Sequence, residues 1–262
     1  MGLDVRAGLA ELTAMGFLAV LPALFLWRLF TTNAPDLATI PSGDFTDIHL
    51  PYRLFIARTL AAGDSPFWNP YVVAGHSSLG DIQYQVFYPL SLAVEWFAGS
   101  AMNVQVLEAL VAIHLALASL FTYSFARHLM PGRLGPLVAA LAFTYGGYLT
   151  SFPIEQVIIL QVSIWLPLIL LLLEMALAKR RAECFVLAGL VAAICVLAGH
   201  PQTVVYVAVG AGLYGAFRLW DTGFTLRRLV GLVAVPILAL GLAAVQLYPS
   251  YQHLQLTTRT EV

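Results

Sequence analysis

The sequence predicts an all-α integral membrane protein with about seven transmembrane helices. Of its 262 residues, 60% are hydrophobic and only 10% are charged, and the mean hydropathy is +0.83. Soluble domains carry about 25% charged residues, so this composition excludes an ordinary soluble domain. The net charge of −1 gives no reason to expect nucleic acid as a partner, and the composition instead predicts that the chain sits in a lipid bilayer.

Seven apolar segments approach the length of about 20 residues that a helix needs to cross the hydrocarbon core. The first is longer than the apolar part of a signal peptide, and no A-x-A cleavage site follows it, so we expect a retained helix. No Gly-rich or Ser-rich linker and no internal repeat divides the chain, which we therefore treat as a single module, 1–262. The predicted spans are 12–30, 104–126, 135–152, 157–177, 183–199, 202–218 and 229–247.

The longest polar interval lies between the first two spans, in loop 31–103. Its stretch "LPYRLFIARTLAAG" begins with a proline suited to a first helical turn and ends at a glycine, which predicts a helix near 51–62. The mixture of Leu, Phe and Ile with Arg53 and Arg58 is typical of a helix that lies along the membrane surface. Either arginine could bind a lipid phosphate or only anchor the helix among headgroups.

Two topologies remain open, and they differ in whether segment 84–99 crosses the membrane. This segment, "YQVFYPLSLAVEWFAG", is short and is interrupted by Pro89 and Glu95. If it does not cross and the N-terminus is cytoplasmic, nine basic residues lie inside and four outside, and loop 31–103 is external. If it crosses and the N-terminus is outside, twelve basic residues lie inside against one, and the loop is cytoplasmic. Charge favours the second topology, whereas segment length favours the first.

Carboxylates in this loop are the main catalytic candidates. In "SGDFTD", Asp44 follows a turn-forming Ser-Gly pair, and Asp47 comes three residues later. A carboxylate at the mouth of a membrane cavity can accept a proton from a hydroxyl or help to bind a metal ion. We favour Asp44 as the general base, with Asp47 second. The alternative is that Asp44 only caps the helix that follows, and the residues alone do not decide between the two.

Further polar residues are predicted to lie at the same face or just inside a span. Glu108 lies about one turn inside the second span, where an ionisable residue usually faces a cavity or a partner. His200 and Gln202 flank a proline in "GHPQ" at a predicted turn, where they either contact substrate or only join two helices. A single His beside a Gln makes no metal site, so we assign no metal ligands.

The order of these features resembles the YfhO-type bacterial membrane proteins. The resemblance rests on the N-terminal helix, the acidic loop with its surface helices, the run "WNPY…G…Q…FYP" and the later "GHPQ" between two apolar segments, and it covers about residues 12–258. That family belongs with the GT-C membrane glycosyltransferases. The resemblance therefore implies a GT-C-like bundle in which 84–99 is a surface or re-entrant helix and loop 31–103 is extracytoplasmic.

The resemblance also implies a reaction. A sugar would move from a polyprenyl-phosphate donor to a hydroxyl of a cell-envelope glycopolymer, lipid or protein, on the outer face of the bacterial cytoplasmic membrane. Asp44 matches the first aspartate of the GT-C acidic motif, whereas Asp47 stands further along than the motif's second. Gln83, His200 and Gln202 lie in the shared runs and would contact sugar or phosphate. A basic residue or a divalent cation, Mg²⁺ or Mn²⁺, would stabilise the donor phosphate.

Members of this family are generally longer, so the resemblance also predicts that the chain is an N-terminal portion of a longer protein. A non-catalytic transporter or flippase-like protein is the alternative function. It would use Glu108, His114 and Gln161 as a polar path through the bundle. The gathering of polar residues in one loop favours the transferase, and the sequence lacks the matched, interrupted helices that many transporters carry in their two halves.

Overall fold

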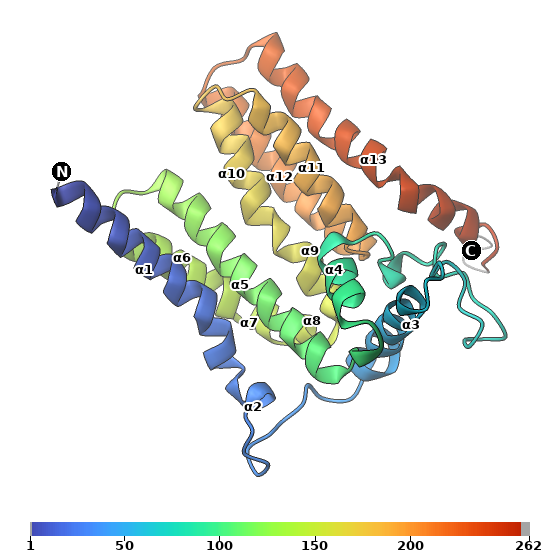
Figure 1. The fold of residues 1–262 in the computed structure, drawn as a ribbon. Helices are drawn as coiled ribbons and strands as arrows, with labels where there is room; N and C mark the ends of the chain where they lie inside the picture. The colour runs from blue at the N-terminus through green and yellow to red at the C-terminus, as the bar shows by residue number, and fades with distance from the viewer. Residues whose placement is uncertain (1, 258–262) are drawn as a thin grey trace.

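The computed structural model describes residues 2–257, and these form a bundle of helices capped at one end by a layer of shorter elements (Figure 1). No β-strand occurs in this part of the chain, which confirms the predicted all-α class. The long elements, which run along the bundle, are α1 (Gly2–Phe25), α5 (Val104–Leu129), α6 (Leu134–Tyr145), α9 (Val157–Ser163), α10 (Trp165–Leu177), α11 (Glu183–Leu197), α12 (Pro201–Asp221) and α13 (Leu226–Leu254).

Five helical stretches in the described residues are long and apolar enough to cross a membrane: Gly8–Phe25, Val104–Leu129, Val157–Leu177, Pro201–Asp221 and Leu226–Leu254. Two further apolar helical stretches, Leu134–Thr150 and Glu183–Leu197, are shorter. These lengths support a protein that spans the membrane several times, and the count of seven spans stays a prediction.

Two of the predicted spans are interrupted. The span at 157–177 breaks at Ile164 between α9 and α10, because Pro167 has no N–H to bond to the carbonyl of Ser163 and its ring crowds that carbonyl. The span at 135–152 ends earlier than expected, at Tyr145. Its remainder forms two single turns, α7 (Gly147–Thr150) and α8 (Phe152–Glu155). Both breaks lie toward the end of the bundle that carries the layer (Figure 1).

Residues 31–103 form this layer, which we call the loop layer, and α2 (Trp27–Phe30) leads into it (Figure 1). Its elements are η1 (Phe45–His49), α3 (Leu50–Ala61), η2 (Ile82–Tyr84), α4 (Pro89–Ala98) and η3 (Gly99–Ala101). Helix α4 has ten residues and packs against α3. It is about 15 Å long, half the thickness of the hydrocarbon core, so it lies in the layer and does not cross the bundle.

The predicted helix at 84–99 begins only at Pro89. Gln85 adopts a left-handed backbone conformation with φ of 54°, which ends the short turn η2 and separates it from α4. The predicted helix at 51–62 is observed as α3, and it continues directly from the turn η1. The loop layer therefore consists of two packed helices joined by a long irregular connection.

A buried ion pair joins the two helices of the layer. Arg53 on α3 and Glu95 on α4 are 2% and 1% exposed, and Arg53 Nη1 lies 2.6 Å from Glu95 Oε1. The Arg53 guanidinium also donates to the carbonyl of Tyr84. Burial raises the pKa of the Glu95 carboxyl, while the charge of Arg53 opposes that change. The pair therefore fixes how α3 and α4 meet.

Four buried polar side chains of the long helices bond to the loop layer. Two come from α5, one from α9 and one from α13, and their partners are spread over the whole length of the layer. The pairs are Glu108 with the Ile40 N–H (2.9 Å), His114 with the Tyr88 hydroxyl (2.8 Å), Gln161 with the Gln85 amide (2.5 Å) and Gln246 with the Leu79 carbonyl (2.8 Å). These bonds hold the layer at a fixed position on the bundle.

We expect Glu95→Leu to destabilise the protein strongly, because it leaves the Arg53 guanidinium buried without its counter-charge. Removing one partner of a buried pair costs about 3–5 kcal/mol of unfolding free energy. Thermal or denaturant unfolding in detergent would measure the loss. Arg58→Leu is the matched control on the same helix, since Arg58 is exposed, and it should change stability by less than about 0.5 kcal/mol. Equal effects of the two substitutions would contradict a structural role for the pair.

Candidate functional site

Asp44 stands at the start of the turn η1, which has the wide π-helical geometry and runs directly into α3. Single π-turns are rare and frequently occur at functional sites. Asp44 is half-buried, and its side chain makes no capping hydrogen bond to the turn. Among residues 2–257 the carboxylate has no hydrogen-bond or ion-pair partner. The capping alternative is therefore not what this side chain does, and the carboxylate is free to act on a ligand.

His49, at the other end of the same turn, is a candidate site residue that the sequence interpretation missed. Its side chain is buried, 2% exposed, and Nε2 lies 3.4 Å from Gln156 Oε1 at the loop end of the bundle. The pKa of His49 is lowered from 6.5 to about 4, chiefly by burial and also by the charges of Arg53 and His200, while the Gln156 hydrogen bond and the charge of Asp44 act in the opposite direction. His49 is therefore a neutral imidazole at neutral pH that lies within electrostatic reach of both Asp44 and His200.

His200 reaches this cluster from the start of α12. Its Nδ1 accepts a hydrogen bond from the Thr203 N–H (3.2 Å) and lies 2.7 Å from the Thr203 hydroxyl, so the side chain caps the helix. Because Nδ1 is the acceptor, the proton of the neutral ring sits on Nε2. Partial burial lowers the pKa of His200. The ring thus offers a fixed N–H donor at the loop end of the bundle.

The turn that carries His200 is held tightly against η2. Gly199 has φ of +85°, and a Cβ added there would lie 2.6 Å from the Ile82 carbonyl oxygen, so only glycine fits. Gln85 donates through Nε2 to the Ala198 carbonyl and to Gln161 Oε1. The "GHPQ" sequence therefore forms a turn that packs against η2. Its glycine allows the close approach to Ile82, and its histidine caps α12.

Four other predicted site residues are exposed side chains. The Asp47 carboxylate accepts from the Thr46 hydroxyl at 2.8 Å, and Gln202 donates to the Tyr206 hydroxyl at 2.6 Å. Arg58 and Gln83 are exposed at the surface of the layer. Asp47 accordingly lies on a different side of η1 from the buried His49, and the structure does not bring the two aspartates into one buried pair.

The structure gives Arg53 and Glu108 positioning tasks instead of substrate contacts. The guanidinium of Arg53 donates hydrogen bonds to Glu95 and to the Tyr84 carbonyl inside the layer. Glu108 is fully buried, and its Oε1 accepts from the Ile40 N–H, four residues before Asp44. Neither side chain is open to a ligand at the surface, and both hold the segment that presents Asp44. Substrate binding by these two residues stays a prediction.

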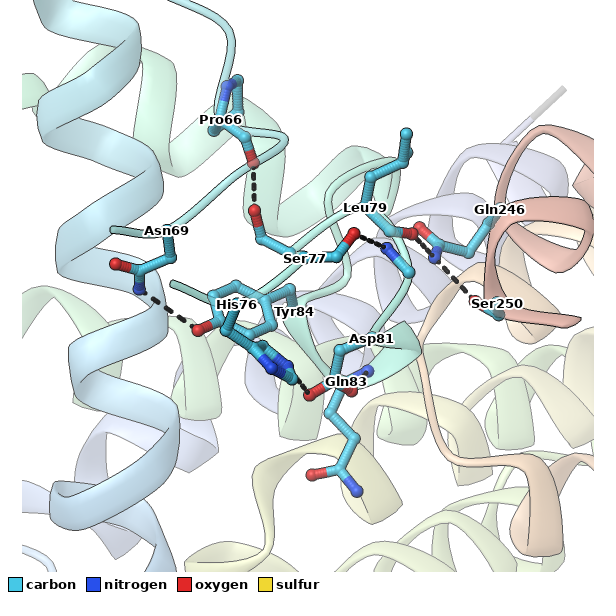
Figure 2. Close-up of polar contacts among 12 residues, drawn as sticks. Pro66, Asn69, His76, Ser77, Leu79, Asp81, Gln83, Tyr84, Gln246 and Ser250 are labelled. Atoms are coloured by element: carbon cyan, nitrogen blue, oxygen red, sulfur yellow. Dashed lines mark hydrogen bonds and ion pairs between the residues drawn. The ribbon is translucent and has the colours of Figure 1, made fainter. Parts of the chain in front are cut away.

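A second polar cluster fixes the irregular part of the loop layer (Figure 2). His76 Nε2 lies 3.2 Å from Asp81 Oδ2, and Asn69 donates to the Tyr84 hydroxyl at 3.1 Å. Asp81 Oδ1 in turn accepts from the Gln83 N–H and caps η2. Figure 2 also shows Gln246 of α13 bonding to the Leu79 carbonyl. This cluster orders the connection between α3 and α4. The Asp81 carboxylate already has hydrogen-bond partners within the cluster.

The fold brings few ligand side chains together for the expected divalent cation. Among residues 2–257, no group of three or more His, Cys, Asp or Glu side chains is placed to hold a metal ion. Asp44 is the free carboxylate of the Asp44–His49–His200 cluster, so Mg²⁺ or Mn²⁺ would need most of its ligands from substrate phosphate and water. The requirement for a cation stays a prediction, and no step below depends on it.

Comparison with known families shows to which family the chain belongs. A family model described as "Bacterial membrane protein YfhO" matches residues 15–262, which is nearly the whole chain. The chain belongs to the YfhO family. Neither the curated proteins nor the solved structures contain a match. The match confirms the resemblance based on the acidic loop and "GHPQ", and with the apolar helices it places this YfhO-family protein in a bacterial membrane.

We expect His49 to make the protein less stable as the pH falls from about 6.5 to about 4. In the unfolded chain the imidazole takes up a proton near pH 6.5, whereas in the folded protein it does so only near pH 4. The unfolded state therefore binds more protons in this window, and stability falls by up to about 3 kcal/mol as the pH drops through it.

Unfolding midpoints measured at several pH values would check this, with His49→Gln as the test variant. That substitution should flatten the profile between pH 6.5 and 4, whatever it does to stability at pH 7. His128→Gln is the control, because His128 is exposed on α5. A His49→Gln profile as steep as that of the wild type would show that another group carries the pH dependence.

Proposed function

We propose that this YfhO-family protein is a membrane glycosyltransferase of the GT-C type. It would transfer a sugar from a polyprenyl-phosphate donor to a hydroxyl of a cell-envelope glycopolymer, lipid or protein, on the outer face of the cytoplasmic membrane. The observation that carries the proposal is the free, half-buried carboxylate of Asp44 within electrostatic reach of the neutral imidazole of His49, which in turn lies within reach of His200. The family relationship supplies the reaction class.

In the proposed reaction Asp44 acts as the general base. The acceptor hydroxyl gives its proton to the Asp44 carboxylate while its oxygen attacks the anomeric carbon of the donor sugar. The bond from that carbon to the phosphate oxygen breaks, and polyprenyl phosphate leaves with the bonding electrons. A base positioned in this way typically contributes 10²–10⁴ in rate. A single displacement inverts the anomeric carbon, as the resemblance to GT-C enzymes implies.

The neighbouring histidines suit this chemistry because they carry no charge. Burial lowers the pKa of His49 and of His200, so both rings are neutral at neutral pH and add no positive charge to the site. The fixed Nε2–H of His200 is a hydrogen-bond donor for a sugar hydroxyl or a phosphate oxygen. The exposed Arg58, Gln83 and Gln202 would contact donor or acceptor further from the reacting carbon.

The arrangement of buried polar residues favours the transferase over the transporter alternative. A polar path through the bundle would need Glu108, His114 and Gln161 to face a common cavity. Each of them instead bonds to a residue of the loop layer, at Ile40, Tyr88 and Gln85 respectively. These side chains support a layer fixed at one end of the bundle, which suits a catalytic surface better than a moving gate.

We expect Asp44→Asn to lower sugar transfer by about 10²–10⁴, because the amide keeps the shape of the carboxylate but cannot accept the proton. The assay is incorporation of labelled sugar from a polyprenyl-phosphate donor into the envelope fraction of membranes that carry the full-length protein. Asp47→Asn is the control, since Asp47 is exposed and bonded to Thr46, and it should keep most of the activity. Near-normal transfer by Asp44→Asn would remove this residue as the base.

We expect the loop layer to face the outside of the cell. After replacement of the buried Cys184 and Cys195 by Ala, a single cysteine at Ser65 should react in intact cells with a membrane-impermeant maleimide. Ser65 and Lys179 are both exposed, at opposite ends of the bundle. A cysteine at Lys179 should react only after lysis. The reverse pattern would put Asp44 in the cytoplasm and would contradict the proposed reaction site.

A further inference from the structure

The end of the bundle opposite the loop layer carries a cavity that the proposed reaction does not use. It has a volume of about 220 Å³ and lies between the connection from α10 to α11 and the start of α13. Its floor is apolar, formed by Ala176 and Phe185, which are 2% and 7% exposed. Its polar lining is dominated by the side chains of Arg180, Arg227 and Arg228.

The charge of this cavity is not balanced by the protein. None of the residues that line it is an aspartate or a glutamate. Arg180 and Arg227 are exposed, and within residues 2–257 neither has a hydrogen-bond or ion-pair partner. The nearby Arg218 differs, because its guanidinium binds Glu174 at 2.6 Å and also Asp221. Arg180 and Arg227 thus line the cavity without a counter-charge from the described residues.

Arg228 gives the cavity a fixed wall. Its Nη1 donates to the carbonyls of Thr222 and Gly223, both at 2.6 Å, and so ties the start of α13 to the end of α12. The floor is equally constrained, because α13 approaches α11 closely at Gly231, where an added Cβ would lie 2.5 Å from the Phe185 ring. The cavity is therefore part of the helix packing.

Exposed apolar side chains continue from the cavity along the bundle. Leu226 and Val230 on α13 are 71% and 58% exposed, and Val186 on α11 is 52% exposed. In a membrane-spanning bundle such residues face lipid chains. A ligand that fits both surfaces has an anionic head for the arginines and apolar chains for the helices. Basic pockets between transmembrane helices are suited to this class of lipid.

We propose that this cavity binds the headgroup of an anionic phospholipid, with its phosphate on Arg180, Arg227 and Arg228 and its acyl chains along α11 and α13. A role in setting topology explains basic residues at this end of the bundle by charge alone. It does not explain why Arg180, from the connection between α10 and α11, meets Arg227, from the first turn of α13, at one cavity while Lys179 and Arg181, in the same connection as Arg180, lie outside its lining.

The test compares lipid binding by two double variants of equal charge. Arg180→Gln/Arg227→Gln removes the two unpaired arginines of the cavity, and Lys179→Gln/Arg181→Gln removes two basic residues beside it. Each full chain is purified in detergent, and its affinity for phosphatidylglycerol and for phosphatidylcholine of the same chain composition is measured by native mass spectrometry. We expect the first variant to lose about 25-fold in phosphatidylglycerol affinity, since each basic residue near a lipid surface contributes about fivefold.

The second double variant should keep phosphatidylglycerol affinity within about threefold of the wild type, because a screened surface charge contributes less than a direct contact. Ala182→Leu provides an independent check, since it fills the cavity without changing any charge and should also weaken binding. Equal losses in the two double variants, or equal affinity for the two lipids, would overturn the proposal. Binding of inorganic phosphate as tight as that of the lipid would also overturn it, because the acyl chains would then contribute nothing.

Discussion

The structure depends on one constraint: polar side chains withdrawn from water at the end of a membrane bundle must find partners. An unbonded polar group in such surroundings costs several kcal/mol. Here the partners come from the loop layer, as in the bond from Glu108 to the Ile40 N–H and that from Gln161 to Gln85. The bundle and the layer therefore satisfy most of each other's buried polar atoms, although Glu108 Oε2 and Gln246 Oε1 have no partner within the described residues. The position of Asp44 follows from that arrangement.

The shape of the layer depends on an ion pair that is buried within it. Arg53 and Glu95 join α3 to α4, and the Tyr84 carbonyl shares the guanidinium. Because α3 continues directly from η1, fixing α3 also fixes the turn that carries Asp44 and His49. A catalytic group gains from such support, because small displacements of a reacting group cost much of its effect.

The sequence was informative where a single segment decides the outcome. Apolar length predicted the all-α membrane class, and a carboxylate beside a turn predicted Asp44 as a candidate base, whose side chain proves to be free of capping bonds. It did not show the burial of Arg53 and Glu108, because their partners lie 42 and 68 residues away and no local pattern reveals such bonds. His49 was missed for the same reason, although it follows the acidic motif directly. The break before Pro167 could have been predicted, since proline removes a backbone donor wherever it stands in a helix.

The two ends of the bundle distribute positive charge differently, and this bears on the proposed reaction. At the loop end, Arg53 is neutralised by Glu95, and Arg58 lies nine residues beyond His49, about 13 Å along α3. A donor phosphate held beside Asp44 would add negative charge to an existing carboxylate, with only neutral imidazoles close by. Two negative groups in a partly buried site repel each other strongly. The proposed chemistry would therefore gain from positive charge beyond what the Asp44–His49–His200 cluster supplies, and either a basic residue or the predicted Mg²⁺ or Mn²⁺ would supply it.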